Sequence, residues 1–201
     1  MSNRRKGHYA ERELQYLEEA VRRRAPEVVL EIGVYLGRST KAIADALPDR
    51  GTVIAVDPWR DADGFHRKVA GMASEHNRAN PDRSIVVCRS MSHDAAKAWV
   101  DPRIDFVHID GDHRSLGVYR DIRDWLPHLS KDGFFIGHDW PVEGVRFGVC
   151  AALEDGLLRE VGLSDVQRCG TSALWWGIPS ACSSEKGMTP IPPTPSYSLL
   201  T

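Results

Sequence analysis

The chain has 201 residues, a formal net charge of -2 and 42% hydrophobic residues, so no overall basic field favours binding to nucleic acid or to a membrane surface. The four cysteines are scattered without a zinc-like spacing, and no apolar run approaches the ~18 residues of a membrane span. We therefore expect a cytoplasmic protein built around one α/β domain.

The first predicted element is a helix over 8–24, because the apolar residues Leu14, Leu17 and Val21 lie three and four residues apart. The apolar run 27–33 then predicts a strand that is buried on both faces. Helices and strands alternate from there. The expected elements are helix 38–48, strand 51–59, helix 64–78, strand 84–89, helix 92–100, strand 104–110, helix 115–129, strand 132–139 and helix 142–158.

Two strand-like segments close this pattern, 161–169 and 172–178, with only a turn at Gly170 between them. A parallel crossover needs about a dozen residues, so these strands must be antiparallel. The order predicts a doubly wound, mostly parallel, seven-stranded Rossmann-like sheet with one antiparallel strand near the C-terminus. We divide the chain into an N-terminal helix (1–25), an α/β domain (26–179) and a Pro- and Ser-rich tail (180–201) that we expect to be flexible.

A glycine turn follows the first strand, at the sheet edge where ligands of open α/β folds bind. Gly33 and Gly37 let the backbone approach a ligand, and Ser39 follows at the helix start. Asp57 ends the second strand, where a carboxylate can accept hydrogen bonds from ribose hydroxyls. The G-x-G-x-x-G pattern of dinucleotide enzymes is absent, and Glu31 would repel a pyrophosphate but favour a sulfonium. These residues indicate S-adenosylmethionine in preference to NAD.

Several stretches resemble class I S-adenosylmethionine-dependent methyltransferases, namely VVLEIGVYLGRST, GTVIAVDPW, DFVHIDGDH through GHDW, and TSALWWGI. More narrowly, residues 27–179 resemble the O-methyltransferases akin to the catechol, caffeoyl-CoA and macrolide-sugar enzymes. The resemblance implies that Glu31, Gly33 and Ser39 line the methionine part of the cofactor. It also implies that Asp57 contacts the ribose and Ser90 the adenine.

A second polar group follows the fourth and fifth strands. Asp110, which also belongs to the predicted cofactor-binding set with Gly37, ends one strand, and His138 with Asp139 ends the next. Neighbouring parallel strands would bring these three side chains together as half of an octahedral metal shell. In the resembling metal-dependent enzymes, an Asp and an Asp-Asn or similar pair hold Mg²⁺ at this place. His138 departs from that pattern, and histidine suits Mn²⁺, Fe²⁺ or Zn²⁺ better than Mg²⁺. We therefore expect a divalent metal, Mg²⁺ or Mn²⁺, with another transition metal as an open alternative.

Methyl transfer requires an oxygen nucleophile that is aligned and deprotonated. His113 lies near the place where related enzymes have a lysine base, so we expect it to be the general base. We expect Asp112 either to orient His113 or to contact the cofactor. Two alternatives involve no metal: Asp110 and Asp112 could cap the following helix, and His138 could form a structural pair with Asp139.

The expected function is divalent-metal-assisted O-methylation of a hydroxyl on a small molecule. Three alternatives stay open: a metal-dependent protein similar to cephalosporin hydroxylases on the same fold, a nucleoside-binding protein without catalysis, and an NAD-dependent oxidoreductase. No stretch identifies the acceptor. The short chain has no inserted cap domain, so a second subunit of a homo-oligomer could help to close the site.

Overall fold

The computed structural model describes residues 11–60, 62–100, 103–164 and 174–180. Its helices are α1 (Glu11–Arg24), α2 (Arg38–Ala46), α3 (Asp63–Ala79), α4 (Ser92–Ala98), α5 (Ser115–Trp125) and α6 (Glu143–Glu154), with a 3₁₀ turn η1 (Leu126–His128). The strands are β1 (Val28–Ile32), β2 (Thr52–Asp57), β3 (Ser84–Arg89), β4 (Ile104–Ile109), β5 (Leu129–Gly137), β6 (Leu158–Leu163) and β7 (Trp175–Pro179).

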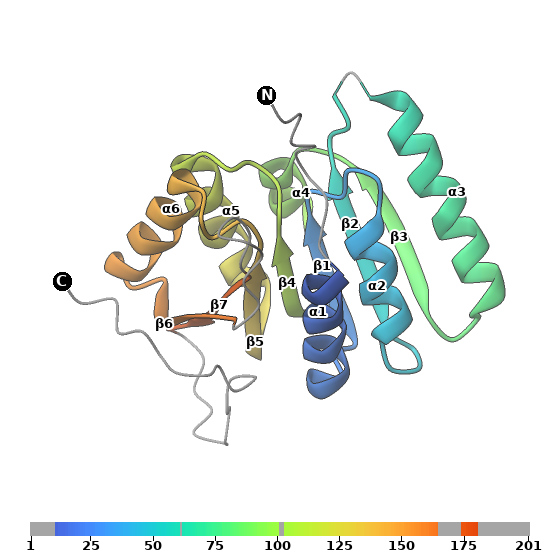
Figure 1. Cartoon of the computed structure of the whole chain (residues 1–201), viewed down its shortest axis with the longest axis horizontal. Helices are drawn as coiled ribbons and strands as arrows, with labels where there is room; N and C mark the ends of the chain where they lie inside the picture. The colour runs from blue at the N-terminus through green and yellow to red at the C-terminus, as the bar shows by residue number, and fades with distance from the viewer. Residues whose placement is uncertain (1–10, 61, 101–102, 165–173, 181–201) are drawn as a thin grey trace.

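The strands form one sheet in the order β3-β2-β1-β4-β5-β7-β6 (Figure 1). The strands β1 to β5 are paired in parallel. Strand β7 runs antiparallel to both of its neighbours, β5 and β6. The predicted fold class, including the single reversed strand near the C-terminus, is confirmed.

Several element boundaries differ from the sequence prediction by a few residues, and the early ends of two helices have a local cause. Helix α5 stops at Trp125 because Pro127, which has no N–H to donate, lies in the 3₁₀ turn that follows. Helix α6 stops at Glu154 because Gly156 turns the backbone into the left-handed region, and β6 therefore begins earlier than expected. The predicted turn at Gly170 and nearly all of the predicted tail lie outside the described residues.

The helices cover the sheet on both faces (Figure 1). Alternate strand residues point to opposite faces, so Val29 packs in one cluster with α1 and α2, whereas Leu30 packs in another with α4, α5 and α6. Helix α3 lies beside β3, on the same face as α1 and α2. The central strands β1 and β4 thus have buried side chains on both faces, as a parallel sheet between helices requires, whereas the edge strands β3 and β6 are less buried.

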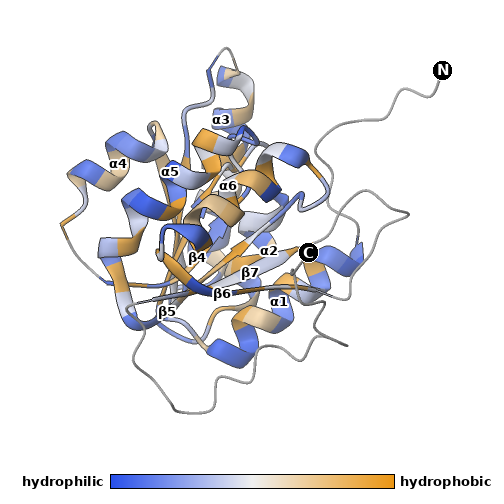
Figure 2. Ribbon diagram, turned by 90° about the vertical axis from the view of Figure 1, so that its left-hand side faces the viewer, coloured by the Kyte–Doolittle hydropathy of each residue, from blue (hydrophilic) through white to orange (hydrophobic). Residues whose placement is uncertain are grey.

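The helices carry apolar and polar residues side by side (Figure 2). In the described ranges, no helix combines the length and the apolar character that crossing a membrane would need. A mixture of apolar and polar residues along one helix is typical of helices that bury an apolar face against a sheet and expose a polar face.

Candidate active site

The turn after β1 passes directly against the end of β4. The N–H of Gly33 donates to the Val56 carbonyl at 3.0 Å, and the N–H of Asp110 donates to the Ile32 carbonyl at 2.8 Å. Gly33 has φ 86°, and a Cβ there would overlap the backbone carbonyl of Asp110. Only glycine allows this close approach, so the two sites predicted from the sequence share one rim of the sheet.

Asp57 holds the glycine turn in shape. One of its carboxylate oxygens accepts the backbone N–H groups of Val34 and Tyr35 at 2.9 and 3.0 Å. The other accepts the N–H of Trp59 at 2.6 Å, and the indole of Trp59 donates to the Tyr35 carbonyl at 2.9 Å. The turn is therefore organised by the residue predicted to contact the ribose. That contact itself stays a prediction.

Glu31 lies deeper than the turn and has no exposed surface. Its carboxylate accepts the Thr40 hydroxyl of α2 and lies 3.2 Å from Nδ1 of His108, its register partner on β4. Ser39 is buried in the first turn of α2, and Ser90 is partly buried with its hydroxyl on the Met91 carbonyl. The predicted cofactor contacts of these residues remain predictions. For Glu31, an effect through its charge fits the burial better than a direct contact.

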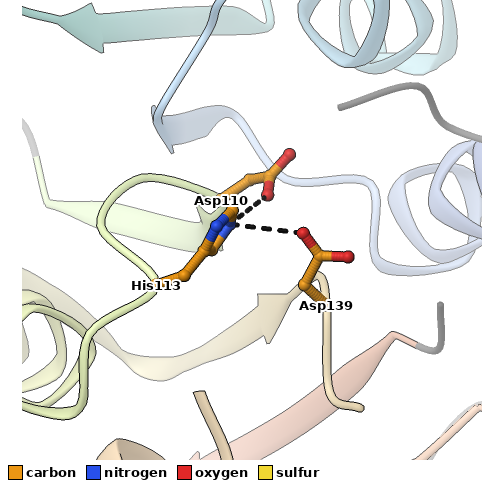
Figure 3. Close-up of side chains that lie close together, drawn as sticks. All are labelled: Asp110, His113 and Asp139. Carbon is orange, nitrogen blue, oxygen red and sulfur yellow. Dashed lines mark hydrogen bonds and ion pairs between the residues drawn. The ribbon is translucent and has the colours of Figure 1, made fainter. Parts of the chain in front are cut away.

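Three side chains converge at the ends of β4 and β5 (Figure 3). They are Asp110, Asp139 and His113, and one ligand atom from each lies within 4.8 Å of the others. Nε2 of His113 is 3.2 Å from Asp110 Oδ1 and 3.3 Å from Asp139 Oδ2. The structure brings together the two predicted carboxylates and adds His113 to them, while metal binding by the predicted ligand His138 stays a prediction. We call these three residues the rim group.

His138 lies beneath the rim group, with 5% of its side chain exposed. Its Nδ1 is 3.5 Å from both Asp110 Oδ1 and Asp139 Oδ1, and its Nε2 is 3.4 Å from Glu13 of α1. Both ring nitrogens thus face carboxylates. Glu13 was missed in the sequence, although its spacing of four residues before Leu17 placed it on the buried face of the helix.

Asp112 points away from the rim group toward Arg114. Its carboxylate accepts the Arg114 side chain at 2.6 to 3.0 Å and the Arg114 backbone N–H at 3.1 Å. A Cβ at Gly117 would overlap Asp112, so that glycine provides the space for it. The N-cap residue of α5, Arg114, makes no side-chain capping hydrogen bond, but its backbone N–H donates to Asp112, so the capping alternative stays open for Asp112. The catalytic role of Asp112 stays a prediction.

The sequence of residues 30–140 matches a family described as methyltransferase domain. The chain belongs to this methyltransferase family. Among curated proteins, the methyltransferase is 27% identical over 139 residues to tricin synthase 2 of Oryza sativa subsp. japonica. That match covers 69% of this chain and 45% of the relative, so the chain spans less than half of that relative's length.

Solved structures share the fold of the methyltransferase. The O-methyltransferase from Bacillus cereus in complex with SAH has a TM-score of 0.72 at 16% identity, covering 88% of this chain and 84% of its own. The O-methyltransferase TomG from Streptomyces achromogenes, involved in tomaymycin synthesis and solved with SAM, has a TM-score of 0.66 at 18% identity, with 86% and 82% covered. At such identities the likeness establishes the fold.

The imidazoles of His113 and His138 and the carboxylates beside them shift each other's pKa values. Burial favours a higher pKa for Asp110, but hydrogen bonds from His113 and His138 hold that pKa well below its usual range. Burial alone would lower the pKa of His138, yet its bonds to Asp110, Asp139 and Glu13 raise that pKa to about 11. The bond to Asp110 likewise raises the pKa of His113. A protonated imidazole cannot bind a metal, and His113, with 43% of its side chain exposed, is the more accessible of the two rings.

A separate groove of about 620 Å³ opens between α4, α5 and η1 of the methyltransferase. It is lined by Ala96, Pro127 and mostly charged or titratable side chains. These are His93, Lys97, Arg120, Arg123, Asp124 and His128. None of the residues predicted from the sequence to bind cofactor or metal lines this groove.

Proposed function

We propose that this methyltransferase transfers a methyl group from S-adenosylmethionine to a hydroxyl of a small molecule, with a divalent cation at the rim group. One observation carries the proposal: the glycine turn of β1 and the rim group meet at the same sheet edge, where Gly33 contacts Asp110. Donor and acceptor sites must adjoin for an in-line transfer. The names of the relatives, tricin synthase and an O-methyltransferase of tomaymycin synthesis, support a small-molecule acceptor.

The cofactor would lie over the turn between β1 and α2. S-adenosylmethionine, when bound, supplies the electrophilic methyl carbon. Gly33 and Gly37 give backbone access, and the amides at the start of α2 with Ser39 can hold a carboxylate. The buried charge of Glu31 favours a cationic ligand above it. Asp57 retains one unused lone pair, on Oδ1, for a ribose hydroxyl, because each carboxylate oxygen has two and Oδ2 already accepts two N–H groups.

The rim group fits a divalent cation by its donor types. Two carboxylate oxygens and one imidazole nitrogen suit Mn²⁺ or Fe²⁺, and Mg²⁺ if water fills the remaining positions. Such a cation lowers the pKa of a hydroxyl bound to it. We assign His113 to the cation, which replaces its expected role as general base. We assign His138 to the carboxylates beneath the cation, as in the expected alternative of a structural pair with Asp139.

Calorimetry with S-adenosylhomocysteine, NAD and Mn²⁺ tests both parts. We expect S-adenosylhomocysteine to bind and NAD to give no signal. Asp57→Ala should weaken S-adenosylhomocysteine binding about tenfold or more, because hydrogen bonds to a charged group contribute ~1.5–3 kcal/mol each. Asp110→Asn should abolish Mn²⁺ binding, whereas Asp132→Asn, an exposed residue near the other end of β5, should leave it unchanged.

Tight binding of NAD without a response to S-adenosylhomocysteine would exclude the methyltransferase function. Equal Mn²⁺ binding by the wild type and Asp110→Asn would exclude the rim group as the metal site. With an acceptor in hand, the product mass separates the reactions, because methylation adds a methylene unit whereas hydroxylation adds an oxygen atom.

A further inference from the structure

Helix α1 contributes a buried carboxylate to the underside of the rim group. Glu13 has no exposed surface, and its Oε2 lies 3.4 Å from Nε2 of His138. The opposite nitrogen of the same ring lies 3.5 Å from Asp110 and from Asp139. Two carboxylates of the rim group and a third from the N-terminal helix are therefore linked through one imidazole.

The sheet itself directs His138 toward α1. Phe134 and Ile136 of β5 pack in the cluster that contains the apolar residues of α1. Side chains alternate along a strand, so His138, two residues beyond Ile136, points to the same face. Its backbone N–H donates to the Ile109 carbonyl at 3.0 Å and extends the pairing of β5 with β4. The ring is thus fixed between the helix and the rim.

Burial makes the contact between Glu13 and His138 energetically important. A carboxylate removed from water is costly unless it is paired, and in the core an alanine or leucine would fill the α1 position more cheaply. Leu17 and Val21, which continue the buried face of the helix, are apolar. Glu13 therefore has a role that packing against the sheet does not require.

We propose that Glu13 is a positioning residue that acts through His138 to hold the Asp110 and Asp139 carboxylates in the orientation a divalent cation needs. The inference rests on the proposed metal-assisted function. Removing a residue that hydrogen-bonds to a metal ligand, without contacting the metal itself, typically lowers metal affinity by about 10- to 100-fold. The N-terminal helix is then part of the active site and not only a cover for the sheet.

Titration of the full chain with Mn²⁺ by calorimetry tests this proposal. Glu13→Gln should lower Mn²⁺ affinity by about tenfold or more, while affinity for S-adenosylhomocysteine stays within the error of the wild type. Glu19→Gln is the matched control, because Glu19 lies on the same helix but is exposed and paired with Arg23. This control should bind both ligands as the wild type does.

A double-mutant cycle identifies the route of the effect. If Glu13 acts through His138, adding Glu13→Gln to His138→Gln should cause no further loss of Mn²⁺ affinity. The proposal would be overturned if the losses of Mn²⁺ affinity in the two single variants multiplied in the double variant. It would also be overturned if Glu13→Gln bound Mn²⁺ as tightly as the wild type. A wild type that binds S-adenosylhomocysteine but not Mn²⁺ would overturn the metal-assisted function and this inference with it. Should Glu13→Gln fail to fold, Glu13→Asp keeps the charge but withdraws it from His138, and wild-type Mn²⁺ affinity in that variant would equally overturn the proposal.

Discussion

Asp121 of α5 is a carboxylate that folding removes from water, with 7% of its surface exposed. Burial raises its pKa to about 7, and the negative charges of Asp112 and Asp124 act in the same direction, whereas a hydrogen bond with Ser92 opposes them. Ser92 also accepts the indole N–H of Trp125 at 2.9 Å. Asp121 thus joins α5 to Ser92, the first residue of α4.

This carboxyl group predicts a fall in stability as the pH rises. In the unfolded chain an aspartate releases its proton near pH ~3.9, whereas the folded protein retains it up to about pH 7. Between these values the native state binds more protons than the unfolded state, so its stability decreases with pH, by up to ~4 kcal/mol from this group. Asp121→Asn should remove that slope and be more stable than the wild type at pH 8.

Urea unfolding at pH 5 and pH 8 measures the difference. Asp132→Asn, which changes an exposed aspartate, should keep the pH dependence of the wild type. If Asp121→Asn shows the same pH dependence as the wild type, Asp121 is ionised in the folded protein throughout this range.

The element that joins the two sites is the turn between β1 and α2. Gly33→Ala would place a Cβ against the backbone of Asp110 at a φ of 86°, where an alanine is strained as well. We expect a loss of ~2 kcal/mol or more in the free energy of unfolding, since strain and overlap each cost at least ~1 kcal/mol. Affinity for S-adenosylhomocysteine should fall with it.

Gly71 is the matched control for this substitution, because it lies inside α3 with open space where a Cβ would stand. Gly71→Ala should increase the free energy of unfolding by ~0.5–1 kcal/mol, the usual difference between alanine and glycine in a helix. Denaturant titration of the two variants gives both values. Equal effects of the two substitutions would contradict the close approach of the turn to β4.

At the scale of the whole molecule, α1 and the sheet share one core. Leu17 of α1 is completely buried in the cluster that contains Val29 and Phe106 of the central strands. Leu17→Ala should therefore lower the free energy of unfolding by ~2–5 kcal/mol, the cost of emptying a core leucine site. Leu116→Ala, at a leucine that is 55% exposed, should change it by less than ~0.5 kcal/mol.

Thermal and denaturant unfolding of both variants, followed by circular dichroism, provides the comparison. A small effect of Leu17→Ala would mean that α1 is an appendage that can detach from the α/β core. Because Glu13 lies one turn before Leu17, such detachment would also break its contact with His138.

The sequence by itself determined the order and type of the elements, because alternating apolar runs and turn residues act locally. It also determined that Asp57, Asp110 and Asp139 would stand at one edge, since parallel strands bring their carboxyl ends to the same side. Helices α5 and α6 end earlier than their apolar patterns predicted, because Pro127 and Gly156 follow their last residues.

Only the tertiary structure showed how two imidazoles share the carboxylates, because His113 contacts Asp110 and Asp139 from the exposed side and His138 contacts them from the buried side. His113 and His138 both follow strands that end at the rim, so neither spacing nor residue type distinguishes them. On its buried side His138 lies 3.4 Å from Glu13, which comes from a helix far away in the sequence. Contacts between distant segments form when side chains pack in three dimensions, and no local pattern in the chain encodes them.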